Sequence, residues 1–490
     1  MLFNSLAFIF LFLPVTVAVY FALNRHRLTV AAKAWLVAAS LFFYSYWDVA
    51  YLPLMLTSIL FNFAVGAALS GGLAAGRLNS AAARKLVLTF AIAANLGLLG
   101  FFKYADFFLG NVNVALGADF ALLHIVLPLG ISFFTFTQIA YLVDAHAGTV
   151  KENDYLNYSL FVTFFPHLLA GPILHHREMM PQFDSLRAKA LNYKNLSVGL
   201  YLFFIGFFKK VALADTFATW ANAGFGAAHS LTLIEAWTAS LSYTLQLYFD
   251  FSGYTDMALG AALMLNIRLP INFNSPYRAS SIQDFWRRWH ITLSRFLRDY
   301  LYIPLGGNRS GSLRTYGNLM ATFVLGGLWH GPAWTFVAWG TLHGAALVAH
   351  RMWSQMGLRM HRVLAWFVTF NFINLTWVFF RAKNWDQAVD MLQAMAGMNG
   401  VVLPEWLGRF LYALAPHGVR FGHPLAQING DLTTLPMIAA GLGLALFAAN
   451  SNALAHSFKP GRRTLVFTIA LAIGGFMAMT SVTEFLYYNF

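Results

Sequence analysis

An apolar stretch of the chain, LGGLWHGPAWTFVAWGTLHG at residues 325–344, decides which kind of fold the sequence can form. A helix of this length crosses the hydrocarbon core of a bilayer, which is about 30 Å thick. Two glycines and the pair Gly331 and Pro332 interrupt it, so we expect the helix to break there, with Pro332 in the first turn of the next helix. A broken helix persists at membrane depth only where protein or a water-filled cavity satisfies its freed backbone groups. His330, directly before the break, is therefore expected to face a cavity.

The whole chain has the composition of a membrane protein. Its 490 residues are 59% hydrophobic and only 10% charged, against about 25% charged residues in soluble domains. Apolar runs recur from one end to the other, and the start lacks the basic region of a secretory signal. We predict an all-α, multi-pass membrane protein with apolar segments near 2–24, 32–47, 50–70, 86–102, 120–143, 155–173, 196–216, 232–249, 251–267, 316–330, 333–350, 363–380, 432–450 and 464–483.

The charge balance indicates how the chain sits in the membrane. Lys and Arg number 32 against 19 Asp and Glu, a net charge of +13. In a membrane protein this excess marks the cytoplasmic face and anionic lipids, so we expect no nucleic-acid partner. Basic clusters after the first and third apolar segments predict cytoplasmic loops and an extracytoplasmic N-terminus; they comprise Arg25, Arg27 and Lys33, and then Arg77, Arg84 and Lys85.

Several chemistries are excluded or unsupported by the residues. The chain has no cysteine, which excludes disulfides, thiolate catalysis and Cys-ligated metal centres. It contains no G-x-S-x-G nucleophile elbow, Walker A loop or G-x-G-x-x-G fingerprint. His167, His175 and His176 lack the H-E-x-x-H spacing of a zinc site, so no bound metal is predicted.

An arginine-rich stretch, residues 277–314, cannot span a bilayer. It interleaves seven arginines with aromatic residues: Arg278, Arg287, Arg288, Arg295, Arg298, Arg309 and Arg314. Ser280 and Gln283 have the spacing of a capping box, and apolar residues then recur at helical spacing. We predict an amphipathic interfacial helix near 280–302, with its basic side toward lipid headgroups.

Ionisable residues within apolar sequence are the candidates for function. His330 is the strongest, His290 on the arginine-rich helix is second, and His343 is weaker. Asp250 lies in YFDFSGYTD, residues 248–256, where it either lines the cavity or, as we prefer, pairs with one of the arginines. Asn274, in INFNSPYR, is interpreted with Asn272 as ordering a turn. A neutral imidazole can take the proton from an attacking hydroxyl, so one candidate function is acyl transfer. The alternative is a transporter, because broken helices are also typical of transporters.

Three motifs carry a family resemblance: YFDFSGYTDMALG (248–260), FWRRWHITLSRFLRDYLYIPLGGNR (285–309) and GGLWHG (326–331). They resemble the membrane-bound O-acyltransferase family, and within it the bacterial branch that O-acetylates alginate, peptidoglycan and other polysaccharides. The resemblance covers most of residues 1–385. It implies one membrane-embedded domain over 1–490, with a ring of about 11 or more tilted helices around a central tunnel, in a bacterial inner membrane.

The resemblance also implies roles for individual residues. His330 matches the catalytic histidine of the W-H-G motif, and His290 matches the second invariant polar position on the cytoplasmic side of the tunnel. Candidates to line the tunnel or bind the donor are Trp329, Asp250, Asn274, Trp286, Arg287, Arg298 and His343. The implied donor is acetyl-CoA, used as a substrate rather than a bound cofactor, with arginines available for its phosphates.

The acceptor side is implied by the same resemblance. Acetyl would pass to extracytoplasmic partner proteins similar to SGNH hydrolases, or directly to a polysaccharide. The tail FLYYNF, residues 485–490, resembles the aromatic end of companion peptides in teichoic-acid D-alanylation, which makes Tyr487 a candidate acyl relay; the alternative is an aromatic end packed at the interface. D-alanyl or other acyl transfer from a carrier-protein thioester to a cell-envelope polymer stays open as a second function.

Overall fold

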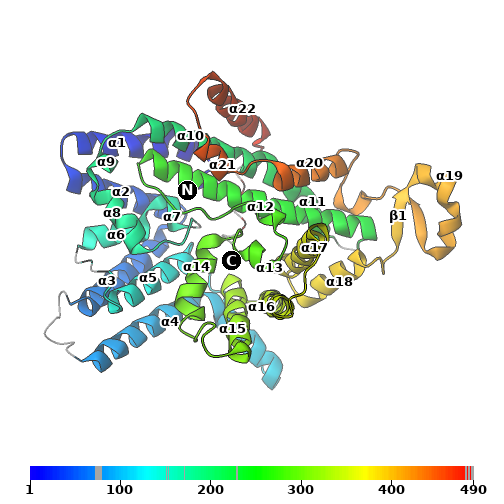
Figure 1. Cartoon of the computed structure of the whole chain (residues 1–490), viewed down its shortest axis with the longest axis horizontal. Helices are drawn as coiled ribbons and strands as arrows, with labels where there is room; N and C mark the ends of the chain where they lie inside the picture. Colours follow the sequence, from blue (N-terminus) through cyan, green and yellow to red (C-terminus); the bar gives the residue numbers. More distant parts are fainter. Residues whose placement is uncertain are drawn as a thin grey trace.

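The computed structural model describes residues 1–71, 80–150, 152, 154–169, 171–227, 230–480, 483 and 486. Helices form most of this part of the chain (Figure 1). The longer helices are α1 (Leu13–Arg25), α2 (Thr29–Ser45), α3 (Leu52–Leu69), α4 (Ala81–Leu116), α5 (Ile131–His146), α10 (Tyr193–Phe208), α11 (Asp215–Phe225), α12 (Leu233–Met264), α15 (Ser312–His330), α16 (Trp334–Gln355), α17 (Arg362–Arg381), α20 (Thr434–Phe447) and α22 (Arg462–Ala478). The shorter ones include α6 (Tyr155–Thr163), α7 (Phe165–Leu168), α8 (His176–Asp184), α9 (Leu186–Lys189), α18 (Trp385–Met395) and α21 (Ser451–His456).

Several of these helices are suited to a membrane. Within the described residues, 5 helical stretches are long and apolar enough to cross a bilayer: Phe8–Arg25, Val49–Leu69, Ala81–Leu116, Tyr193–Phe225 and Arg362–Arg381. α2 and α20 are shorter apolar helices. These stretches support the prediction of a multi-pass helical membrane protein. The ring of about 11 or more helices and the central tunnel stay predictions.

Helix α12 runs through the middle of the molecule, with α10 and α11 beside it (Figure 1). Small residues allow the close contact with α10: a methyl group added at Gly206 would collide with the Gly253 carbonyl oxygen, and one at Gly199 would press on Gly260. The two separate segments expected at 232–249 and 251–267 are therefore wrong. They form one helix because Gly253 serves close helix packing and does not end the helix.

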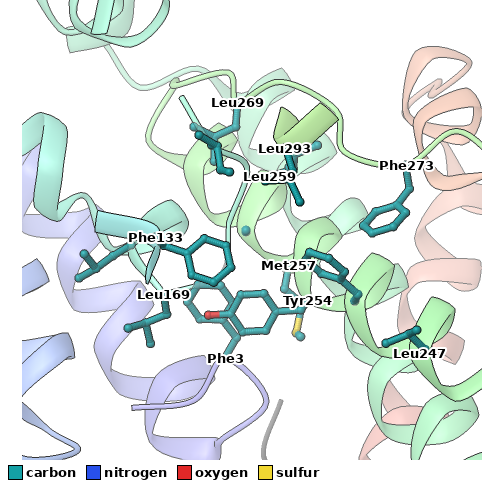
Figure 2. Packing of buried hydrophobic residues seen from close by; sticks show 14 of the residues in the cluster. Phe3, Phe133, Leu169, Leu247, Tyr254, Met257, Leu259, Leu269, Phe273 and Leu293 are labelled. Carbon is teal, nitrogen blue, oxygen red and sulfur yellow. The ribbon is translucent and has the colours of Figure 1, made fainter. Parts of the chain in front are cut away.

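The amino-terminal residues differ from the predicted first segment at 2–24. Residues 1–5 are not helical, and the helix continues through the π-helical turn η1 (Phe8–Phe12) into α1. Phe3 is fully buried and stacks on Tyr254 of α12 at 4.7 Å between ring centroids. Figure 2 shows Phe3 among Tyr254, Phe133 and Leu169 in the core. The start of the chain is thus a core-filling segment.

The segment expected at 120–143 is helical only from Ile131. Residues 118–128 form no regular structure, and Gly130, with φ 71°, precedes α5 as its N-cap. This positive φ favours glycine, so Gly130 sets the start of the helix shortly after Pro128. α4, by contrast, is longer than the predicted 86–102 and extends to Leu116, where Gly117 ends it in the left-handed conformation.

A small lobe after α18 departs from the all-helical prediction. β1 (Val401–Pro404) pairs in parallel with β2 (Val419–Gly422), and short helical turns including α19 (Gly408–Leu411) connect them. Figure 1 shows β1 and α19 at one end of the molecule, away from α4 and α5. Runs of four residues carry too little periodicity to predict such a sheet from sequence.

The arginine-rich stretch is not one helix over 280–302. It divides into α13 (Ile282–Trp286), α14 (Ile291–Leu297) and the π-helical turn η5 (Arg298–Tyr302). Ser281, and not Ser280, caps α13 by accepting the Asp284 N–H at 3.1 Å. The break lies at His290, whose φ of 43° is left-handed. There the backbone bonds to a neighbouring loop instead: Asn274 N–H donates to Arg288 O at 2.9 Å.

Candidate active site

His330 is the last residue of α15, and the predicted break follows it. Gly331 is extended, Ala333 is the N-cap, and α16 begins at Trp334. The break is therefore confirmed, whereas the placement of Pro332 in the first turn of α16 is wrong: Ala333, which is still extended, separates it from the helix. A side chain at position 331 would overlap the Phe336 ring, so the turn requires glycine.

Aromatic rings surround the His330 imidazole, which is buried. Its centroid lies 4.9 Å from that of Trp329, 5.1 Å from Trp339 and 5.1 Å from Phe380. Trp329 in turn stacks on Phe136 at 5.0 Å. This packing holds the imidazole in a low-dielectric environment, in which a neutral base is favoured over a charged one.

The end of α15 is held by α4, through two residues that the sequence reasoning missed. Lys103 Nζ donates to Trp329 O at 2.5 Å and to His330 O at 3.2 Å. The Tyr104 hydroxyl donates to Leu328 O at 2.6 Å. The predicted segment at 86–102 stopped just before these residues. A lone lysine inside a long apolar helix was the signal that could have identified them.

His290 is fully buried, and its proton can be assigned from its neighbours. Its Nδ1 lies 3.1 Å from Asn272 Oδ1. The same oxygen accepts the Thr292 N–H at 3.2 Å and the Thr292 hydroxyl at 2.9 Å, so it is an acceptor. The proton is therefore assigned to Nδ1, which makes Nε2 the proton-accepting nitrogen. Asn272, interpreted from sequence as a turn residue, thus also orients His290.

His343 on α16 has both ring nitrogens engaged. The Trp286 indole N–H donates to His343 Nδ1 at 3.2 Å. Thr376 donates its hydroxyl to Ile373 O at 2.9 Å, so its oxygen accepts from His343 Nε2 at 3.1 Å. These bonds fix Trp286 and His343 against Trp339. They support an orienting role for His343, and its lining of a tunnel stays a prediction.

Asp250 is buried on α12, and lysine is its partner. Lys210 Nζ lies 2.7 Å from Asp250 Oδ1 and 2.9 Å from Asp215 Oδ1. On the same helix, Asp256 pairs with Lys209 at 2.7 Å. Asp250 thus forms an ion pair, as in the preferred interpretation, but its partner is a lysine and the predicted arginine partner is wrong; its lining of a tunnel stays a prediction. π-Helical turn η3 (Lys209–Ala214), which follows α10 and packs against α12, brings the two lysines to these carboxylates.

The predicted donor-binding residues differ in whether their side chains already have ion-pair or hydrogen-bond partners. Arg287 is exposed, and no ion pair of it is found within the described ranges. Arg298 pairs with the adjacent Asp299 at 2.7 Å. Asn274 accepts a hydrogen bond from Asn450 at 2.9 Å, which supports the turn-ordering interpretation. The part of these residues in donor binding stays a prediction.

The structure brings some of these residues together. Lys103 donates to the His330 carbonyl oxygen, and Trp339 contacts both the His330 and the His343 rings, at 5.1 and 4.7 Å between centroids. Beside the His330 ring lies a cavity of about 670 Å³, whose walls include Phe336 and Phe380, the latter in ring contact with His330. Polar groups from several helices complete the lining: Lys210, Asp215, Gln246, Arg381 and Lys383. An apolar histidine site thus adjoins a polar cavity.

The predicted relay residue Tyr487 lies outside the described residues. Two neighbours in sequence are described, and each is anchored to a carboxylate that also pairs with Lys210. The Thr483 hydroxyl donates to Asp215 Oδ2 at 2.7 Å, and the Leu486 N–H donates to Asp250 Oδ2 at 3.0 Å. Thr483 and Leu486 both line the cavity beside His330. No group of three His, Asp or Glu that could hold a metal is found in the described part of the chain.

Comparison with known proteins decides the family. The sequence profile of the membrane-bound O-acyltransferase family matches residues 6–384. The chain belongs to this family. Membership identifies it as a membrane-embedded acyltransferase, and His330 lies inside the matched region. The lobe with β1 and β2 lies beyond it.

The relatives of this acyltransferase include O-acetylating proteins and a D-alanyltransferase. A peptidoglycan O-acetyltransferase from Helicobacter pylori is 47% identical over 100% of this chain and 98% of its own length. A probable alginate O-acetylase from Pseudomonas aeruginosa is 42% identical over 83% of this chain and 76% of its own. A teichoic acid D-alanyltransferase from Bacillus subtilis is 29% identical, over 52% of this chain and 69% of its own.

Proposed function

We propose that this acyltransferase moves an acetyl group from a cytoplasmic donor, acetyl-CoA, across the bacterial inner membrane for O-acetylation of an extracytoplasmic polysaccharide. The observation that carries the proposal is the position of His330, buried at a helix break and beside a polar cavity. Two relatives that match most of this chain are named for acetylation of a polysaccharide, peptidoglycan in one case and alginate in the other.

In this mechanism His330 acts as a general base. Its neutral imidazole takes the proton from an attacking hydroxyl, whose oxygen forms a bond to the acetyl carbonyl carbon. The bond from that carbon to the coenzyme A sulfur then breaks, and the imidazolium returns the proton to the leaving thiolate. His290, with its proton-accepting Nε2, would assist donor placement or proton handling on the cytoplasmic side. Arg287 and Arg298 would offer charge to the phosphates of the donor.

Replacing the base tests the proposal. We expect His330→Ala to abolish acetyl transfer in liposomes supplied with acetyl-CoA while its abundance in the membrane stays normal. A loss of at least about 100-fold follows from the contribution of a general base. His417→Ala, an exposed histidine in the lobe after α18, is the matched control and should keep activity. Transfer by His330→Ala at the rate of the control would refute the role of His330.

The first acceptor is tested by labelling. We propose that acetyl passes through Tyr487 to a partner protein similar to an SGNH hydrolase, because the neighbouring Leu486 and Thr483 line the cavity beside His330. Vesicles given labelled acetyl-CoA should carry label on Tyr487, identified by peptide mass, and Tyr487→Phe should carry none. Active vesicles with an unlabelled tail would instead indicate direct transfer to the glycan.

A second candidate is D-alanyl transfer from a carrier-protein thioester. It is favoured by the teichoic acid D-alanyltransferase relative, which matches about half of this chain. The same liposomes can be supplied with D-alanyl carrier protein in place of acetyl-CoA. We expect turnover with acetyl-CoA; turnover with the carrier thioester alone would support the second candidate.

A further inference from the structure

A second cavity, of about 340 Å³, lies on α10, α12 and α21, away from the cavity beside His330. Its rim carries three basic side chains: Lys194 of α10, Arg268 after α12, and His456 at the end of α21. All three are exposed, and the described residues that line the cavity include no carboxylate. No ion pair or side-chain hydrogen bond involves these three groups within the described ranges, so they are available to an anion.

Most of the other side chains that line this cavity are apolar. They include Val198 and Leu202 of α10, Leu259 and Leu263 of α12, and the nearby Leu269 and Phe458, while Asn195 and Asn452 add polar groups. A small hydrated anion gains nothing from such walls, whereas an acyl chain does. The cavity therefore combines a site for a negatively charged group with a site for hydrocarbon.

The position of the cavity agrees with the headgroup region of a bilayer. Tyr193, next to Lys194 at the start of α10, is 75% exposed, as is typical of aromatic residues at a membrane interface. The chain continues directly from His456 into a basic segment, with Lys459 in the loop after α21 and Arg462 and Arg463 at the start of α22. By the positive-inside rule this region is cytoplasmic, where anionic lipids are found.

We infer that this cavity binds one anionic phospholipid, with the phosphate on Lys194, Arg268 and His456 and an acyl chain against α10 and α12. Its occupancy would brace α21 against the start of α10. The inference is independent of the proposed acetyl transfer, because no residue of the cavity belongs to the site around His330.

Native mass spectrometry of the full chain with added phosphatidylglycerol tests this inference. The wild type should retain one tightly held lipid. Lys194→Ala with Arg268→Ala should bind it about 30-fold more weakly, as expected for the loss of two basic groups near a lipid phosphate. The control, Arg409→Ala with Arg420→Ala in the lobe, removes the same charge and should bind like the wild type. Equal retention by both double variants would overturn the inference.

Two further arms separate the lipid from other anions. Leu263→Trp fills the cavity without changing charge, and it should also weaken retention of phosphatidylglycerol. Phosphatidylcholine, whose headgroup is neutral overall, should not be retained, and 10-fold excess inorganic phosphate should not displace the lipid. Displacement by phosphate, or normal retention by Leu263→Trp, would indicate a site for a small anion without an acyl chain. Either result would overturn the inference that the cavity binds a phospholipid.

The contact between α4 and the end of α15 carries a second, independent inference. The last carbonyl groups of a helix have no donors within the helix, and at membrane depth water does not replace them. Lys103 and Tyr104 supply the donors for Leu328, Trp329 and His330. Lys103 is only 7% exposed, and its ammonium also contacts Ser132 Oγ at 3.3 Å. A cation at this place complements the negative end of the helix.

We infer that Lys103 is a positioning residue for His330, which fixes the end of α15 and therefore the imidazole. This inference rests on the proposed function of His330. Lys103→Met keeps the length of the side chain and removes the donors, so the end of α15 and the histidine would shift. A displacement of about 1 Å at a catalytic group can lower turnover about 100-fold.

Kinetics and a chemical probe together test the role of Lys103. We expect Lys103→Met to lower kcat about 100-fold with the KM for acetyl-CoA within about twofold, Lys103→Arg to recover part of kcat, and Lys85→Met at the exposed start of α4 to behave like the wild type. Normal kcat in Lys103→Met would overturn the inference. Diethyl pyrocarbonate labelling of His330 needs no donor, so it detects an altered imidazole even if the acetyl-transfer proposal fails; an unchanged labelling rate would also overturn the inference.

Discussion

At the scale of single residues, buried charges on α12 are neutralised by lysines from the neighbouring π-helical turn η3. Lys210 lies between Asp250 and Asp215, each within 2.9 Å, and these two carboxylates also hold Leu486 and Thr483. Burying a charge is costly unless it is paired. The ion pairs therefore keep polar groups inside an apolar helix bundle and at the same time anchor the described part of the carboxyl-terminal segment.

Removing the lysine should leave the buried carboxylate of Asp250 without its ion-pair partner and take one partner from the half-buried Asp215. We expect Lys210→Met to lower the stability of the folded protein by about 3–5 kcal/mol, the typical cost of breaking a buried pair. Lys210→Met with Asp250→Asn should recover part of this loss, since one of the two carboxylates is then uncharged. Thermal unfolding in detergent measures both. A single variant as stable as the wild type would show that the pair contributes nothing to stability.

At the scale of elements, the contact between α15 and α16 places His330. The two helices approach closely at Gly327 and Gly340, where an added methyl would press on the backbone of the partner helix. Gly317, on the same helix α15, faces open space. We expect Gly327→Val to destabilise the protein by about 1–3 kcal/mol, as overpacking does, and to abolish acyl transfer, while Gly317→Val keeps activity. Thermal unfolding and transfer assays measure this, and an active Gly327→Val would contradict the argument.

Sequence predicted these elements unevenly. Apolar composition and the glycine and proline at 331–332 predicted the membrane helices and the break after His330, because both depend on local properties. The single helix α12 and the interruption at His290 depend on partners far along the chain: Lys210 for Asp250, and the loop at Asn272 and Asn274 for the backbone around His290. Lys103 was missed for the same reason, since only the folded chain brings it to the end of α15.

At the scale of the whole molecule, the basic residues indicate one orientation in the membrane. Basic side chains lie at the ends of α1 and α16, after α12, and at the starts of α4, α10, α15, α17 and α22; they are Arg25, Arg351, Arg268, Arg84, Lys194, Arg314, Arg362 and Arg462. If consecutive long helices cross in alternating directions, with α10 and α11 crossing together as the one apolar stretch Tyr193–Phe225, all these ends fall on one side. The positive-inside rule makes that side cytoplasmic. The lobe after α18 would then lie on the extracytoplasmic side.

The absence of cysteine from the chain allows a direct test of this orientation, because any single introduced thiol is the only one. Leu432, before α20, is 96% exposed, and Ser457, after α21, is also exposed. We expect a membrane-impermeant maleimide to label Leu432→Cys in intact spheroplasts and Ser457→Cys only after permeabilisation, because α20 would separate the two positions across the bilayer. The reverse pattern would invert the orientation and place the lobe in the cytoplasm. Labelling of both in intact spheroplasts would mean that α20 does not cross the bilayer.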